Sequence, residues 1–230
     1  VPDTTVFRAV PRRKARAARE AWLFVVMALL VLGAGLGLRD PWPSDEPRFA
    51  LVAKQMVDSG QWLFPHRGLE LYSDKPPMLM WWQATLYSVI GNWRVAFLLP
   101  SLIAALGTLW CVVDLGRRLW TRRVGLYAGW ALLFALQFTF QAKKAQIDPL
   151  LVLFITLANY GLLRHLLLGP AWRWWWAGWF FAGIGVITKG VGMLALLMIL
   201  PAAIASARHW PRVRLHARDL RFWLAPLAFV

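Results

Sequence analysis

The chain has 230 residues, of which 59% are hydrophobic and 16% charged, and its mean hydropathy is +0.50. This is more apolar surface than a soluble core of that size needs, which argues against a soluble globular domain. The 26 Lys and Arg residues against 11 Asp and Glu give a net charge of +15, but the basic residues form short clusters between apolar runs. That layout is typical of a membrane protein and not of a nucleic-acid binder.

Apolar runs of nearly the ~20 residues that cross a bilayer predict an all-α polytopic membrane protein. After a basic tail over residues 1–20, we expect a membrane domain over residues 21–207 with about six spans. A single straight helix over residues 174–207 would measure roughly 51 Å, too long for a membrane, so two short spans hinged at Lys189 are predicted there. The other four spans are predicted near residues 21–38, 95–113, 124–140 and 149–163, the last extending to 168.

The distribution of charge orients these spans. With a cytoplasmic N-terminus, most Lys and Arg residues fall on the inside, including a basic loop over residues 208–221, while the long loop 39–94 lies outside. A further apolar run starts near Phe222 and stops at Val230, so we expect residues 222–230 to begin another span of a longer protein. The expected location is the plasma membrane, the inner membrane of a bacterium.

The outer loop 39–94 is predicted to contain two interfacial helices. Between Pro47 and Gly60 the apolar residues share one helical face, which predicts an amphipathic helix lying on the membrane surface. Residues 61–65 should be extended or irregular. A second helix is expected to begin at Pro76-Pro77 and to end before Gly91, and its roughly 13 residues are too few to span a bilayer.

Four polar groups converge on the outer face in this topology. Ionisable residues beside a membrane tend to be functional, and carboxylates near lysines can supply a base and bind a phosphate. The groups are Asp45-Glu46, Asp74-Lys75, Lys143-Lys144 with Asp148, and Thr188-Lys189-Gly190.

Ordinary structural explanations compete with function at each group. Asp45 before Pro47, and Asp148 before Pro149, would suit simple helix N-termini. Lys189 is the hardest to explain structurally, because a lysine between two short apolar helices needs an anionic partner or an aqueous opening.

The candidate ligands for a divalent metal ion are His66 and Asp74, although a solvated loop histidine is the simpler explanation for His66. Other oxygen ligands, Asp45 and Asp148, lie far apart in the sequence. The chain has no P-loop and no Rossmann glycine fingerprint. We therefore expect no nucleotide cofactor and a substrate that arrives already activated.

In order and spacing, these residues resemble the polytopic glycosyltransferases of the aminoarabinose transferase and protein mannosyltransferase superfamily. The resemblance covers about residues 22–205 and is nearest to the bacterial aminoarabinose transferase branch. It implies a GT-C type bundle of transmembrane helices with interfacial helices in the first outer loop, and a soluble outer domain beyond this chain. It is carried by Asp45-Glu46-Pro47-Arg48-Phe49-Ala50, Ser59-Gly60-Gln61-Trp62, Tyr72-Ser73-Asp74-Lys75-Pro76-Pro77-Met78, Asp148 and Thr188-Lys189-Gly190.

The resemblance also implies a reaction. A sugar would move from a polyprenyl phosphate to a lipid, glycan or protein acceptor on the periplasmic or extracellular side, with inversion at the anomeric carbon. Asp45 matches the carboxylate at the catalytic centre, as general base or organiser of the acceptor, and Asp148 matches a second acidic position. Lysines would offset the charge on the departing phosphate. The implied substrate-binding residues are Glu46, Arg48, Tyr72, Asp74, Lys75, Lys143, Lys144 and Lys189.

Two positions depart from the family pattern: Asp74 stands where glutamate is commoner, which puts metal binding there in doubt, and Phe49 replaces a common tyrosine. The rival hypothesis is a transporter or polyprenyl-lipid flippase, which would place its ionisable residues at mid-membrane in related halves. Here they gather at one face and we detect no internal repeat. A non-catalytic scaffold is the third alternative. The sequence leaves the sugar, the acceptor and the polyprenol open.

Overall fold

The computed structural model describes residues 10–43 and 45–229, and the protein is almost entirely helical. In chain order the helices are α1 (Val10–Gly33), α2 (Glu46–Ser59), α3 (Met78–Ile90), α4 (Trp93–Ala96), α5 (Leu99–Leu119), α6 (Arg122–Leu133), α7 (Leu136–Ala142), α8 (Ile147–Leu168), α9 (Trp172–Lys189), α10 (Ile199–Ala207) and α11 (Leu220–Leu224). Two 3₁₀ segments, η1 (Gly190–Met198) and η2 (Ala225–Ala228), and one antiparallel hairpin, β1 (His66–Arg67) with β2 (Glu70–Leu71), complete the fold.

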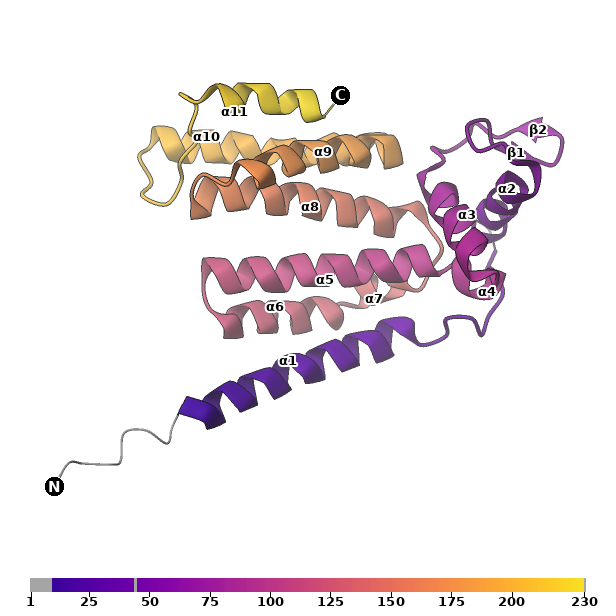
Figure 1. The fold of residues 1–230 in the computed structure, drawn as a ribbon, viewed down its shortest axis with the longest axis horizontal. Coiled ribbons are helices and arrows are strands. Elements are labelled where there is room, and N and C mark those ends of the chain that lie inside the picture. Colours follow the sequence, from indigo (N-terminus) through magenta and orange to yellow (C-terminus); the bar gives the residue numbers. More distant parts are fainter. Residues whose placement is uncertain (1–9, 44, 230) are drawn as a thin grey trace.

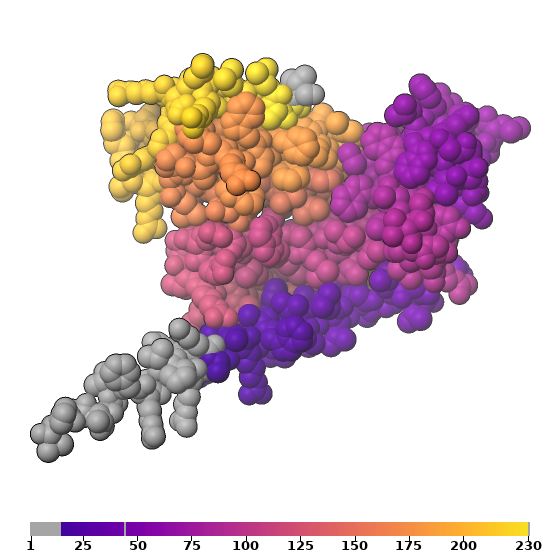
Figure 2. Space-filling model, in the orientation of Figure 1, coloured from indigo at the N-terminus to yellow at the C-terminus, as the bar shows by residue number. Residues whose placement is uncertain are grey.

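The long helices α1, α5, α6, α8 and α9 lie side by side and form a bundle (Figure 1). Helices α2, α3 and α4 and the β-hairpin gather at one end of this bundle, which we call the loop end. The turns that join α5 to α6 and α8 to α9 lie at the opposite end, which we call the far end. In the space-filling view the loop-end elements form a continuous mass over the ends of the helices (Figure 2).

Within the described residues, three helical stretches are long and apolar enough to cross a membrane: Trp93–Leu119, Ile147–Leu168 and Trp172–Ala207. Helices α6 and α7 meet at 69° and count as a fourth if they form one broken span. This chain is therefore a multi-pass membrane protein with the predicted all-α class, although the predicted third span is bent. The full count of six spans stays a prediction.

The stretch from Trp172 to Ala207 turns back on itself. Trp175 near its start packs in the same apolar cluster as Ile199 and Ala202 near its end. A Cβ added to Gly192 would collide with the backbone of Gly185, so the two limbs meet at glycines. The chain reverses around Lys189, which is the position of the predicted hinge.

Helix α1 differs from the predicted first span. It begins at Val10 instead of residue 21 and ends at Gly33 instead of residue 38. Gly35 and Gly37 then adopt left-handed conformations with φ of 92° and 76°, which carry the chain through turns toward the loop end. One face of α1, formed by Phe24, Ala28 and Leu32, is buried in a cluster shared with α5 and α6.

The two predicted helices of the outer loop are present. Both end at a glycine in the left-handed region, α2 at Gly60 and α3 at Gly91, as the sequence predicts. The expectation that the apolar face of α2 lies on the membrane surface is wrong, because Val52 and Ala53 in that face are fully buried in a core cluster with residues of α3 and α8. The β-hairpin was not predicted.

Candidate active site

Glu46, in the first turn of α2, joins three segments of the loop end. Its carboxylate accepts two hydrogen bonds from Arg39, at 2.6 and 2.9 Å, one from the backbone N–H of Trp42 at 2.7 Å and one from the backbone N–H of Ala145 at 2.8 Å. Arg39 also donates to the backbone carbonyl of Lys143 at 2.8 Å. The start of α2 is thereby tied to the turns after α1 and to the connection between α7 and α8.

These bonds determine the ionisation of Glu46. Burial alone would raise the pKa of its carboxyl group, but the hydrogen bonds from Arg39 and from the backbone N–H groups of Trp42 and Ala145 outweigh burial, so the pKa lies below the ordinary value. The side chain is 4% exposed and ionised. Both of its oxygens are engaged by the protein, so we assign Glu46 to positioning the loop end and not to contact with substrate.

Asp45 lies immediately before α2 with its side chain 43% exposed. Its carboxylate does not cap the helix; it accepts a hydrogen bond from Arg48 at 2.7 Å. The other terminal nitrogen of Arg48 lies 3.8 Å from a carboxylate oxygen of Asp74. One guanidinium therefore stands between two carboxylates from different parts of the loop.

Tyr72 packs beside this group. The Arg48 guanidinium lies 5.9 Å from the centre of the Tyr72 ring, and the Tyr72 side chain is buried while its hydroxyl lacks a hydrogen-bond partner among the described residues. Burial raises the pKa of this phenol; Arg48 opposes the rise and Asp74 adds to it. Tyr72 and the exposed Lys75 both line a cavity of about 360 Å³.

Asp148 and Lys189 form the second polar group. Lys189, where the chain reverses after α9, donates to the Asp148 carboxylate in the first turn of α8 at 2.7 Å. Their side chains are 39% and 47% exposed. This is the anionic partner that a lysine in such a reversal requires. Asp148 also lines a mostly apolar cavity of about 490 Å³ between α5, α7 and α8, whose walls include Thr108 and Gln141.

The remaining predicted residues, Lys143, Lys144 and His66, lie in other segments of the loop end. Lys143 and Lys144 are half-buried in the connection between α7 and α8, and the Lys144 ammonium lies 4.0 Å from the centre of the Phe140 ring. His66 is half-buried in β1. Over residues 10–43 and 45–229, no three His, Cys, Asp or Glu side chains gather as metal ligands. The protein by itself thus does not complete a metal site at His66 and Asp74, and metal binding there stays a prediction.

The structure therefore brings the predicted residues to one end of the bundle in two groups, Asp45 with Arg48 and Asp74, and Asp148 with Lys189. Both groups border one apolar cluster that includes Phe49, Tyr72 and Ile147. Sequence reasoning missed Arg39, the partner of Glu46. Its signal was an arginine directly after the first apolar run, on the side of the membrane predicted to carry few basic residues.

A polytopic helix bundle with carboxylates and cations at one end is the class defined by this fold and site. The protein family described as dolichyl-phosphate-mannose-protein mannosyltransferase matches residues 74–228. The chain belongs to this family. The resemblance inferred from the sequence is confirmed.

Known relatives refine the comparison. The chain is 27% identical over 214 residues to the undecaprenyl phosphate-alpha-4-amino-4-deoxy-L-arabinose arabinosyl transferase of Shewanella sediminis, with 90% of this chain and 38% of that protein covered. Two crystal structures of ArnT from Cupriavidus metallidurans share the fold. The apo form matches with a TM-score of 0.79 at 25% identity, covering 93% of this chain and 40% of that one. The form bound to undecaprenyl phosphate matches with a TM-score of 0.75 at 24% identity, covering 91% and 40%.

The fold is thus of the GT-C type, as predicted. The chain spans about two fifths of the length of these relatives.

Proposed function

We propose that the protein is a membrane glycosyltransferase that moves a sugar from a polyprenyl phosphate to a lipid, glycan or protein acceptor, with inversion at the anomeric carbon. The observation that carries the proposal is the placement of Asp45, half-exposed and held by Arg48, at the same end of the bundle as the Asp148–Lys189 pair. The relatives are named as transferases of a sugar carried on undecaprenyl phosphate, and we extend that class of donor to this chain.

Asp45 is the proposed general base. An acceptor hydroxyl oxygen attacks the anomeric carbon and forms the new glycosidic bond, while the bond from that carbon to the phosphate oxygen breaks. The bonding electrons leave with the polyprenyl phosphate, and the hydroxyl proton passes to the Asp45 carboxylate. The hydrogen bond from Arg48 orients that carboxylate.

Cationic side chains stabilise the departing phosphate. Lys75 lines a cavity of about 360 Å³, and Lys189 lies where the chain reverses after α9. Positive groups placed where negative charge accumulates are the electrostatic contribution that this transfer needs most. In the structure Lys189 is neutralised by Asp148, so a bound phosphate would share or replace that contact.

The location follows from the charge distribution. We propose that the loop end faces the periplasmic or extracellular side of a bacterial inner or plasma membrane and that the N-terminus is cytoplasmic. Loop-end elements between residues 39 and 94 carry most of the acidic residues, whereas the segment 208–221 at the far end is strongly basic.

The test uses membranes that contain the full-length protein, a labelled sugar on polyprenyl phosphate and a panel of lipid, glycan and protein acceptors. The isosteric variant Asp45→Asn should lose transfer by at least about 100-fold, within the range for a lost general base. The matched control is Asp58→Asn, which removes an exposed aspartate from the other end of the same helix and should transfer like the parent.

Equal transfer by the parent and Asp45→Asn would contradict the assigned role of Asp45. A flippase is not favoured, because the named relatives are transferases. Movement of polyprenyl lipid across the bilayer without transfer to any acceptor would reverse that preference and overturn the proposed function.

A further inference from the structure

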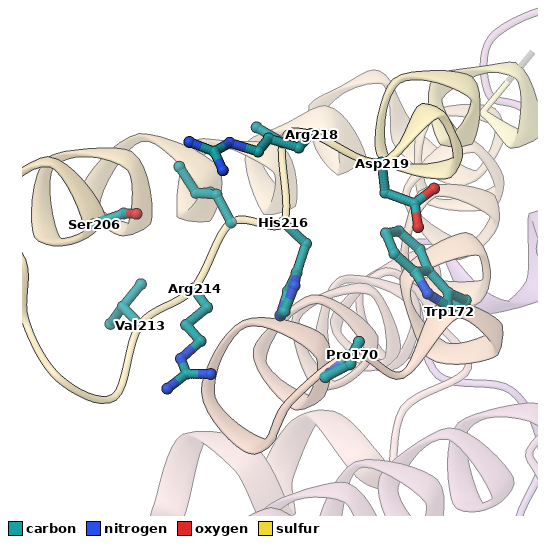
Figure 3. Close-up of a pocket in the computed structure, with 10 residues that line it drawn as sticks. Pro170, Trp172, Ser206, Val213, Arg214, His216, Arg218 and Asp219 are labelled. Atoms are coloured by element: carbon teal, nitrogen blue, oxygen red, sulfur yellow. The ribbon is translucent and has the colours of Figure 1, made fainter.

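A further cavity, lined by both charged and apolar residues, lies at the far end of the bundle, opposite the candidate active site. It measures about 800 Å³ and lies between the turn that joins α8 to α9 and the segment 208–219 that joins α10 to α11. Figure 3 shows the arrangement, with Arg214 and His216 on the connecting segment, Pro170 in the α8–α9 turn and Trp172 at the start of α9. The proposed transfer reaction uses none of these residues.

Cationic side chains outnumber acidic ones on the cavity wall. Arg214 and Arg218 both line it, and neither forms an ion pair with any residue in the part of the chain that the structure describes. One acid, Asp219, also lines the cavity, and its carboxylate accepts a hydrogen bond from the backbone N–H of Arg221 as the cap of α11. The cavity wall therefore carries two arginines against one aspartate, which leaves an excess of positive charge.

The shape of the segment is held by the fold. The backbone N–H of Arg214 donates to the carbonyl of Leu166 in the last turn of α8 at 3.1 Å. The His216 ring lies 5.3 Å from the buried His165 ring and 6.4 Å from the Trp172 ring. The buried Nε2 atom of His216 has no hydrogen-bond partner among residues 10–43 and 45–229. The backbone and ring contacts make the cavity a formed structure.

The surroundings place the cavity at the level of lipid headgroups. Helices α8, α9 and α10 all have an end here, and all three lie within stretches that are apolar and long enough to cross a membrane. Trp210 within the connecting segment and Trp223 in α11 have side chains that are largely exposed. Tryptophans in such positions are typical of the boundary between acyl chains and headgroups. Anionic phospholipids reside at this boundary.

We propose that this cavity binds the phosphate of an anionic phospholipid from the leaflet at the far end, and that Arg214 and Arg218, which lie on opposite sides of the connecting segment, supply the positive charge that attracts it. Guanidinium groups match the geometry of phosphate oxygens, and juxtamembrane arginines are attracted to anionic leaflets. Trp172 and Val213 supply apolar wall for the glycerol and the first carbons of the acyl chains. The proposal does not rest on the proposed transfer reaction.

The test reconstitutes the full-length protein in bilayers of phosphatidylcholine with a minor share of phosphatidylglycerol, extracts it in mild detergent and measures the phosphatidylglycerol retained per protein. The parent should be enriched in phosphatidylglycerol relative to the bilayer. The double variant Arg214→Gln/Arg218→Gln should lose that enrichment by at least about fivefold. The matched control, Arg208→Gln/Arg212→Gln, removes the same charge from the same segment outside the cavity wall and should keep it.

Three results would overturn the proposal. Absence of enrichment in the parent would show that no anionic lipid is held. An equal loss in both double variants would show diffuse attraction to the basic segment instead of a site. Displacement of the retained lipid by excess inorganic phosphate would identify a site for soluble anions. Sugar transfer measured in parallel reports on the loop end, so failure of one proposal is distinguishable from failure of the other.

Discussion

The buried hydrogen bonds of Glu46 predict a large loss of stability when its carboxylate is replaced. The variant Glu46→Gln keeps the shape of the side chain but replaces one carboxylate oxygen by an amide group that cannot accept. Of the four hydrogen bonds that Glu46 receives, two go to each oxygen, so two are lost in either orientation of the amide. The guanidinium of Arg39, which is 17% exposed, also loses its counter-charge.

The expected cost is large because the pair is buried. Removing one member of a buried ion pair typically lowers the free energy of unfolding by about 3–5 kcal/mol, since the other charge remains uncompensated. A domain has about 5–15 kcal/mol in total, so the variant should be near the limit of folding. The control is Asp40→Asn, which breaks the exposed Arg94–Asp40 pair and should cost at most about 1 kcal/mol.

The assay is denaturant unfolding of the full-length protein in detergent, followed by tryptophan fluorescence. A loss of stability in Glu46→Gln no greater than that in Asp40→Asn would refute the reasoning that Glu46 ties the segments of the loop end together. Transfer activity in Glu46→Gln should fall along with the folded fraction, because Glu46 holds Asp45 in place without touching substrate.

The ionisation of Glu46 adds a pH dependence. Because its pKa in the folded protein lies below the ordinary 4.5, its stabilising contribution is fully present above the unfolded-state pKa. That contribution is lost as the pH falls through the lower, folded-state pKa. The free energy of unfolding of the parent should therefore fall more steeply below about pH 4.5 than that of Glu46→Gln. Parallel curves for the two proteins would show that the carboxyl group is not held in its charged form.

Three further substitutions test packing and charge by the same unfolding and transfer assays. Gly161→Ala should cost about 1–3 kcal/mol, because its Cβ would collide with the backbone of α9, whereas Gly33→Ala enters open space and should cost nothing. Lys189→Gln should cost at most about 1 kcal/mol, since its pair with Asp148 is half-exposed; transfer should nevertheless fall at least about tenfold. Tyr72→Phe should leave stability unchanged, because the hydroxyl has no partner among the described residues, and a clear loss of stability would indicate a hidden contact.

Local features of the sequence were sufficient for the short helices of the outer loop. Proline at the start and glycine at the end act within a few residues, so α3 ends at Gly91 as predicted and begins at Met78, directly after the two prolines that were expected in its first turn. The same holds for the end of α2 at Gly60. The reversal around Lys189 was also accessible, because helix length against membrane thickness is a property of the chain alone.

The sequence did not predict which residues far apart in the chain would pair. The pairing of Asp148 with Lys189 depends on how α8 packs against α9, and the contact of Glu46 with Ala145 depends on where the α7–α8 connection lies. The sequence suggested that Lys189 needs an anion without selecting which one. Arg39 was missed for the same reason, because its structural role is to pair with Glu46 and depends on where Glu46 lies in the fold.

By itself, then, the sequence determined the membrane class, the family, the helices of the outer loop and the set of polar residues at one end of the bundle. Hydropathy, helix-capping residues and charge asymmetry are local or additive properties of the chain, so they can be evaluated without knowing the fold. Only the tertiary structure decided that the apolar face of α2 meets protein, that Asp45 pairs with Arg48 while Glu46 is enclosed, and that the far end holds a cationic cavity. The packing of α2, the enclosure of Glu46 and the far-end cavity depend on which surfaces meet when helices distant in sequence pack together. The Asp45–Arg48 pair is local, but several side chains are within reach of Arg48 and only the structure shows which it contacts.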